Sequence, residues 1–211
     1  WPWIVDEINF GELLGDIVEE DADIVLDFQV SQKQSVVYLV SSLFTLKVAE
    51  NILNGLGDDI SFETILGSEY IGFAPDLGAF VTCIGFDESG TESVIFLGTT
   101  NGLYTGKAST AGNEFFAAGA APALVGGTGG YPVKDISVSP EGSMGALISN
   151  LEDDPELLVL IDTAANLSVD FRTFQGLPGN ELHNMVWLDN EMLAVSGDHG
   201  LAVIDTTDIT F

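Results

Sequence analysis

Asp198 and His199 are neighbouring residues whose types could do acid–base chemistry. They stand between glycines in the stretch MLAVSGDHGLAVIDTTDITF, residues 192–211. A carboxylate beside an imidazole is part of many catalytic sites. However, a tight turn also requires Asp and Gly, the first as a side-chain acceptor and the second for its positive φ. Because apolar, β-rich runs flank the pair, we predict that GDHG is a hairpin turn and that His199 is a solvated turn residue.

Clustered acids are the second candidate for chemistry, because closely spaced carboxylates can bind Ca²⁺. One such cluster comprises Glu152, Asp153, Asp154 and Glu156. It does not match the Asp-x-Asp-x-Asp-Gly loop, so we favour a solvated turn and expect no cofactor, with calcium as the alternative. The sequence has only two histidines, which we place in different loops, and this excludes a histidine-rich metal site. It contains no GxSxG, HExxH, CxxC or P-loop motif.

The composition restricts the classes of partner. The chain has 211 residues, of which 46% are apolar, and its 33 acids and five bases give a net charge of −28. Such a surface repels phosphate backbones and anionic lipid, so we expect neither nucleic acid binding nor membrane insertion. The acid excess suits a high-salt or extracellular setting, and we favour an extracellular, cell-surface or periplasmic location. The single cysteine, Cys83, lies in the apolar run FVTCIGF and is predicted to be a buried thiol.

A repeated hairpin is the main structural signal. Residues 35–49, 93–109, 144–164 and 192–208 each contain an apolar strand, a polar or glycine-containing break and a second apolar strand. Upstream strands are predicted at 23–31, 79–89, 133–143 and 182–190. Downstream strands are predicted at 60–67, 114–120, 167–174 and 209–211. Successive hairpins are spaced by 58, 52 and 47 residues, counted from Val36 to Val94, Ala146 and Leu193. Four strands in a constant order at this period predict β-propeller blades rather than a β-sandwich.

Two stretches carry a family resemblance. VKDISVSPEGSMGALIS, residues 133–149, resembles the blade opening of WD40-type and related bacterial seven-bladed propellers. MLAVSGDHGLAVIDTTD, residues 192–208, is similar to the LVIVD-type repeat of bacterial surface proteins. The Trp-Asp dipeptide of WD40 blades is replaced by LID at 160–162 and VID at 203–205, so the WD40 His–Asp network is not carried over. The resemblance spans residues 23–211 and implies a fold rather than a function.

We therefore predict an all-β, propeller-like fold of about four four-stranded antiparallel blades. The expected units are 23–67, 79–120, 133–174 and 182–211, after an acidic segment, 1–22, that forms a short helix or an edge strand. Four units are few for a closed ring, so we expect a larger ring of seven or eight blades. The missing blades could come from the same parent chain, which we favour because the sequence opens at Trp1, or from another copy. Alternatively, residues 3–5 supply an outer strand to the last blade.

Two functions fit this architecture. The first is a non-enzymatic binding or scaffold propeller whose loops contact a protein or glycan partner. The candidate loop residues are Tyr70, Phe73, Tyr131, His183 and Asn184. The alternative is a carbohydrate-active hydrolase or lyase that uses carboxylates of the innermost strands, which would converge toward one face of a ring. These are Asp27, Asp87, Asp135 and Asp189. We favour the binding function, because these acids also suit turns and blade packing.

Overall fold

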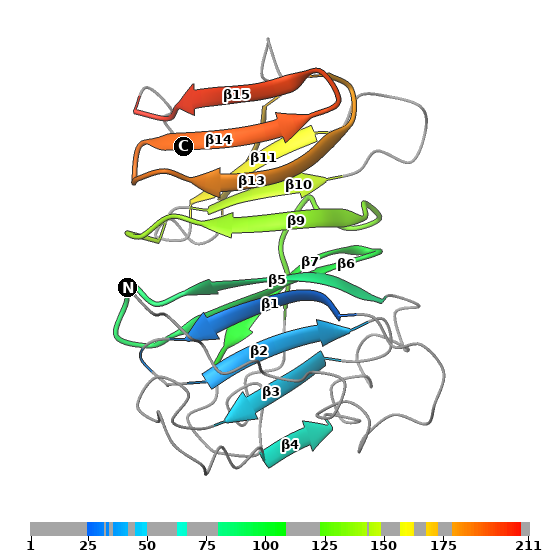
Figure 1. The fold of residues 1–211 in the computed structure, drawn as a ribbon, viewed down its shortest axis with the longest axis vertical. Helices are drawn as coiled ribbons and strands as arrows, with labels where there is room; N and C mark the ends of the chain where they lie inside the picture. The colour runs from blue at the N-terminus through cyan, green and yellow to red at the C-terminus, as the bar shows by residue number, and fades with distance from the viewer. Residues whose placement is uncertain are drawn as a thin grey trace, which may run out of the picture.

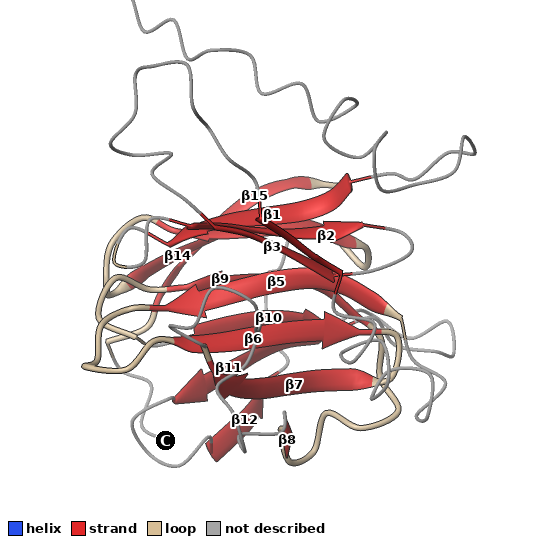
Figure 2. Cartoon of the chain, turned by 90° about the horizontal axis from the view of Figure 1, so that it is seen from below, coloured by secondary structure: helices blue, strands red, loops and turns tan. Residues whose placement is uncertain are grey.

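The structure, a computed structural model, describes residues 25–31, 33, 36–41, 45–49, 63–66, 80–108, 123–142, 144–148, 157–162, 168–172 and 179–207. These ranges form four antiparallel sheets and contain no helix, as the ribbon in Figure 2 shows. The all-β prediction is therefore confirmed. No helix among the described residues is long and apolar enough to span a membrane.

The strands follow one another along the chain within each sheet (Figure 1). The first sheet comprises β1 (Val25–Ser31), β2 (Val36–Ser41), β3 (Thr45–Ala49) and β4 (Glu63–Leu66). The second sheet comprises β5 (Val81–Asp87), β6 (Val94–Thr99), β7 (Gly102–Lys107) and β8 (Ala123–Leu124). The third sheet comprises β9 (Val133–Val138), β10 (Met144–Ile148), β11 (Leu157–Asp162) and β12 (Ser168–Arg172). The fourth sheet, three-stranded within the described residues, comprises β13 (Leu182–Trp187), β14 (Met192–Gly197) and β15 (Gly200–Asp205).

All four repeated hairpins are present, as β2–β3, β6–β7, β10–β11 and β14–β15. The GDHG stretch is the turn of the last one, because Gly197 pairs with Gly200 across Asp198 and His199. Gly200 has a φ of +132° and Gly102, at the same place in β6–β7, has a φ of +126°. Both positions therefore favour glycine for a backbone reason, as the sequence predicts.

The outer strands agree less closely with the sequence. In the second sheet, Leu124 and Ala123 of β8 pair with Tyr104 and Thr105 of β7, although the sequence suggests a loop at 120–132. A two-residue strand is too short to give a periodic signal in the sequence. The fourth strand predicted at 114–120, the stub at 209–211 and the segment 1–22 lie outside the described residues.

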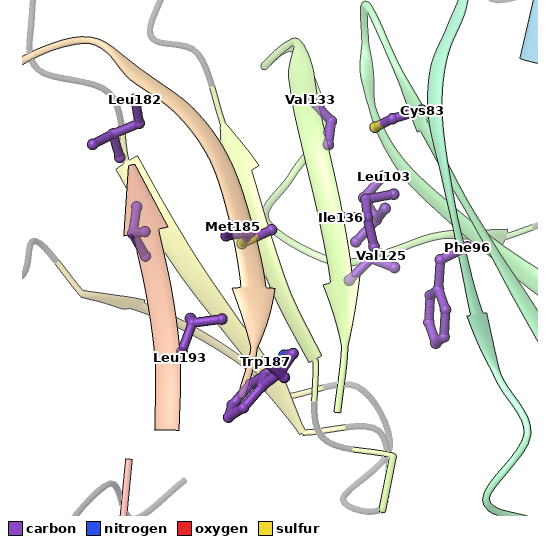
Figure 3. Packing of buried hydrophobic residues seen from close by; sticks show 11 residues of the cluster. Cys83, Phe96, Leu103, Val125, Val133, Ile136, Leu182, Met185, Trp187 and Leu193 are labelled. Atoms are coloured by element: carbon purple, nitrogen blue, oxygen red, sulfur yellow. The ribbon is translucent and has the colours of Figure 1, made fainter. Parts of the chain in front are cut away.

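The first strands of the four sheets, β1, β5, β9 and β13, contact one another in sequence order and are called the inner strands here (Figure 1). The largest buried cluster fills the space between the second, third and fourth sheets (Figure 3). It contains Phe96 and Leu103 from the second sheet, Ile136 from the third, and Met185 and Leu193 from the fourth. Cys83 is also a member, and burial raises the pKa of its thiol, so the prediction of a buried structural cysteine is confirmed.

Candidate binding site along the inner strands

A cavity of about 310 Å³ lies against the inner strands of all four sheets. Its polar lining residues are Gln29 from β1, Asp135 and Ser137 from β9, and Asn184 from β13. Its apolar lining residues include Phe86, Met185 and Val186. A cavity with a few convergent polar groups among apolar ones is typical of a ligand site.

Among the described residues that line this cavity, Asp135 is the only charged one, and it is held by two backbone amides. The N–H of Met185, on the next inner strand, donates to Asp135 Oδ2 at 2.7 Å. The N–H of the following residue, Ile136, donates to Asp135 Oδ1 at 2.9 Å. Both carboxylate oxygens therefore accept a backbone hydrogen bond, and one of these bonds joins the third sheet to the fourth.

Asp27 repeats this arrangement two sheets earlier. The N–H of Ile84, on β5, donates to Asp27 Oδ2 at 2.8 Å, and the N–H of Phe28 donates to Asp27 Oδ1 at 2.8 Å. Asp27 and Asp135 are both the third residue of their strand, at a β-bulge in the pairing with the second strand of the sheet. A bulge re-aims one side chain out of the regular alternation, which places each carboxylate against the neighbouring inner strand.

Burial raises the pKa of both carboxyl groups, and their backbone donors act in the opposite direction. The negative charge of Asp135 also contributes to the raised pKa of Asp27. The other two inner strands have Cys83 and Asn184 at the bulge in place of an aspartate. The third position of the inner strands therefore alternates between a carboxylate and a neutral side chain around the cavity.

The other two predicted carboxylates lie elsewhere. Asp87 ends β5, and its Oδ1 accepts the N–H of Ser89 at 2.8 Å. Asp189 follows β13, and its Oδ1 accepts the N–H groups of Glu191 and Met192, both at 2.8 Å. These are side-chain acceptors that close turns. The structure thus separates the four carboxylates into an inter-sheet pair and a turn pair, instead of bringing them together at one face.

The predicted loop residues are also dispersed. Asn184 lines the cavity, and His183, beside it, is exposed. Tyr131 is half-buried and packs against the core cluster. Tyr70 and Phe73 lie outside the described residues, as do Glu152, Asp153, Asp154 and Glu156.

The Asp198–His199 pair is exposed. Its carboxylate Oδ2 and imidazole Nε2 are 3.6 Å apart, and neither residue lines the cavity. Within the described ranges, no group of three or more His, Cys, Asp or Glu side chains is arranged to hold a metal ion.

Sequence reasoning does not identify Gln29, Ser137 and Val186 as cavity residues. All three occupy the fifth position of an inner strand, as does Gly85, which also lines the cavity. The signal was the shared alternation of the inner strands, in which every second residue has the same orientation. It becomes usable only when the strands are aligned at the bulge, which has no distinct sequence pattern here.

Comparisons with known proteins agree with this architecture. No protein-family model and no curated protein matches the chain. Among solved structures, the Dos1 propeller matches with a TM-score of 0.60 and 13% identity, over 90% of this chain and 45% of that one. The β-propeller domain of Cps50 (Swd1) from Myceliophteria thermophila matches with a TM-score of 0.52 and 12% identity, over 86% of this chain and 50% of that one.

A third match is the extracellular domain of a putative one-component system from B. thetaiotaomicron. It has a TM-score of 0.51 and 13% identity, over 85% of this chain and 21% of that one. The chain thus spans half or less of the length of each of these three structures. At these identities the likeness concerns the fold alone, and by its fold the chain is a β-propeller.

Proposed function

We propose that this chain is a non-enzymatic binding propeller that holds a segment of a protein partner at the cavity along its inner strands. A binding or scaffold role suits the propeller fold in general. The observation that carries the proposal is that the polar residues lining the cavity are of two kinds. The carboxylate of Asp135 is already engaged by two backbone amides, whereas the amide side chains of Gln29 and Asn184 line the same cavity.

Side-chain amides can donate and accept hydrogen bonds, so they match the peptide groups of an extended chain as well as sugar hydroxyls. Phe86, Met185 and Val186 add apolar surface beside them. The net charge of −28 favours a cationic ligand, because it steers basic groups toward the protein and repels acidic ones. A peptide segment rich in Lys or Arg therefore fits the site better than a neutral glycan.

The hydrolase alternative has less support. Glycoside hydrolysis requires two carboxyl groups that flank one bond. Here Asp27 and Asp135 join neighbouring sheets, and Asp87 and Asp189 close turns. Each of the four is therefore committed to backbone donors.

Fluorescence anisotropy with labelled peptides of equal length and basic, neutral or acidic composition tests the proposal, with a panel of neutral oligosaccharides alongside. We expect saturable binding of the basic peptides. The double variant Gln29→Ala/Asn184→Ala should weaken it about tenfold or more, because two hydrogen bonds of about 0.5–1.5 kcal/mol each are removed. His199→Ala, in an exposed turn outside the cavity, is the matched control and should bind like the wild type.

Three outcomes would contradict the proposal. Saturable binding of oligosaccharides but not of peptides would assign the site to glycans. Release of shortened sugars by the wild type would favour the hydrolase. Peptide binding that is equally strong in the double variant and the wild type would place the binding surface elsewhere.

A further inference from the structure

The inner strands pack on one another with a fixed polarity. From the bulge at position three to position six, odd-numbered residues of an inner strand face the following sheet and even-numbered residues face the preceding one. Asp27 and Asp135, both at position three, reach residues at position four of the next inner strand. A Cβ built on Gly85, at position five, would lie 2.4 Å from Ile136 Cγ2, at position four of the next strand. Beyond the bulge, these internal contacts thus join an odd face to an even face.

This polarity leaves one face of each kind uncovered at the two ends of the described sheets. The even face of the first sheet presents Phe28, which is 56% exposed, and Val30. The odd face of the fourth sheet presents Val186 and Leu188, which are 55% and 60% exposed. In the internal contacts, the residues at positions four and six of β5, β9 and β13 are all apolar and are buried or half-buried.

The register of the fourth sheet extends its free face across all three strands. Val186 pairs with Ala194, and Ala194 pairs with Val203, so these residues form a row on one side of the sheet. Leu201, which is 69% exposed, lies two residues from Val203 and so on the same side. Exposed apolar side chains therefore gather on this side of the sheet, beside the polar Ser196 and Asn184 that pair in the row of Leu201. We call this side the end face of the fourth sheet, and exposed apolar faces mark interaction sites.

We propose that a second copy of this chain covers these faces. The end face of the fourth sheet of one copy packs on the even face of the first sheet of the other, and the reciprocal contact closes a ring of two chains. The contact repeats the odd-to-even polarity that the internal contacts show beyond the bulge, and it places Val186 and Leu188 against Phe28 and Val30. The inference rests on other observations than the proposed binding function, although Asn184 and Val186 both line the cavity and belong to the covered face.

The backbone hydrogen bonds fit this contact. Position three of β5 is Cys83, which offers no carboxylate to the third sheet. The N–H of Ile136 on β9 does not need one, because it already donates to Asp135 of its own strand. Position three of β13 is the neutral Asn184. In the proposed ring it would face β1, whose Phe28 N–H already donates to Asp27 of its own strand. At position three, the proposed junction between the fourth and first sheets would therefore match the junction between the second and third, which has a further bond from the Thr82 hydroxyl to the carbonyl oxygen of Val133.

Length also supports two copies. The chain spans 45% of the Dos1 propeller and 50% of the Cps50 (Swd1) propeller domain. Two copies together therefore approach the length of a complete propeller of that kind. A contact between unlike faces either closes a ring or continues as an open polymer, and two half-rings are the arrangement that closes.

Sedimentation velocity and native mass spectrometry of the 211-residue chain test the proposal over a range of protein concentrations. The salt should extend from about 0.1 M to about 1 M, which shortens the Debye length from about 10 Å to about 3 Å and weakens repulsion between the acidic copies. We expect a discrete species of twice 22.3 kDa, favoured by salt. A monomer under all conditions, as expected if further sheets of a longer polypeptide cover these faces, or an open series of larger species, would overturn the proposal.

Two single variants and their mixture identify the faces. Val186→Asp and Phe28→Asp should each be monomeric, because each places a carboxylate in both junctions of the ring. An equimolar mixture of the two variants should recover dimers, since one of its two junctions then contains only wild-type residues. Phe80→Asp adds the same charge at an exposed residue outside both faces and should still dimerise. Circular dichroism confirms that each variant is folded.

The mixture also separates this ring from other dimers. If two fourth sheets packed on each other, Phe28→Asp would remain dimeric. If two first sheets packed on each other, Val186→Asp would remain dimeric. In either case the mixture would show no recovery specific to the pair of variants, and the proposed junction would be wrong.

Discussion

At the scale of single residues, Asp27 and Asp135 have the clearest role, since each joins two neighbouring inner strands through backbone amides. The sequence identifies both as inner-strand acids. It does not distinguish them from Asp87 and Asp189, because the distinction depends on the bulge that turns the third residue toward the next sheet. A bulge is set by the pairing of two strands, and neither strand alone encodes it.

The first prediction concerns Asp135→Asn. An amide supplies one oxygen in place of two, so the N–H of either Ile136 or Met185 loses its acceptor in a partly buried place. We expect the free energy of unfolding to fall by about 1–3 kcal/mol. Urea denaturation measures it, with Glu141→Gln as a control that removes one charge from an exposed turn. Equal stability of the two variants would show that the inter-sheet bond contributes nothing.

The second prediction concerns pH. The pKa values of Asp27 and Asp135 are raised in the folded state above the ordinary value of 3.8, so the folded protein binds their protons more tightly than the unfolded chain does. Their contribution to stability is therefore present at acid pH and is lost as pH rises through the folded-state pKa values. The double variant Asp27→Asn/Asp135→Asn should lose less unfolding free energy than the wild type as pH rises from 3.8 toward neutrality.

Urea denaturation of both proteins at a series of pH values measures this difference. Titration of the other carboxyl groups cancels in the comparison, because the two proteins share them. A pH dependence that is steeper in the double variant than in the wild type would mean that the two groups have lowered folded-state pKa values.

At the scale of elements, the hairpins are what the sequence predicts best. Each has two apolar runs around a turn, and this local pattern suffices because the paired strands are neighbours in the chain. The short strand β8 and the cavity residues Gln29, Ser137 and Val186 were not predictable in this way. Leu124 pairs with Tyr104 across an intervening segment, and the cavity joins residues from four sheets. Contacts between distant segments leave no periodic trace in either one.

The third prediction compares two hairpin glycines. Gly102 and Gly200 have nearly equal positive φ values, 126° and 132°, so alanine causes similar backbone strain of about 1–2 kcal/mol at both. A Cβ at Gly200 meets nothing within 4 Å, whereas a Cβ at Gly102 would lie 2.7 Å from Leu124 Cδ1 and 3.0 Å from the backbone oxygen of Thr128. Gly102→Ala should therefore destabilise the protein more than Gly200→Ala.

Thermal melts of the two variants measure this difference. His199→Ala is the control in the same turn as Gly200, and we expect it to melt like the wild type because its side chain is exposed. If Gly200→Ala lowered the melting temperature more than Gly102→Ala, the packing of the β6–β7 turn against Thr128 and Leu124 would have no energetic weight.

At the scale of the whole molecule, charge and apolar surface act in opposite directions. The buried cluster between the second, third and fourth sheets favours compaction. A partner on the end face of the fourth sheet and the even face of the first sheet would do the same. The net charge of −28 opposes both. Ion pairs among the described residues include Glu92 with Lys107 and Glu181 with Lys134, the latter 3.8 Å apart, and all of these side chains are at least one-third exposed. Such exposed pairs stabilise a protein by about 1 kcal/mol or less.

The last prediction follows from this balance: the melting temperature should rise with KCl. Most of the repulsion acts between exposed carboxylates, and screening shortens its range from about 10 Å at 0.1 M to about 3 Å at 1 M. The matched control is Glu141→Lys/Glu191→Lys, two exposed positions, which changes the net charge from −28 to −28 + 4 = −24. Its melting temperature should be higher than that of the wild type in low salt and should rise less with KCl. Melts at a fixed, low protein concentration keep association out of the comparison. A wild-type melting temperature that stays flat or falls would mean that bound cations or close pairing already compensate the carboxylates, and equal slopes for the two proteins would mean that KCl acts on the apolar core instead.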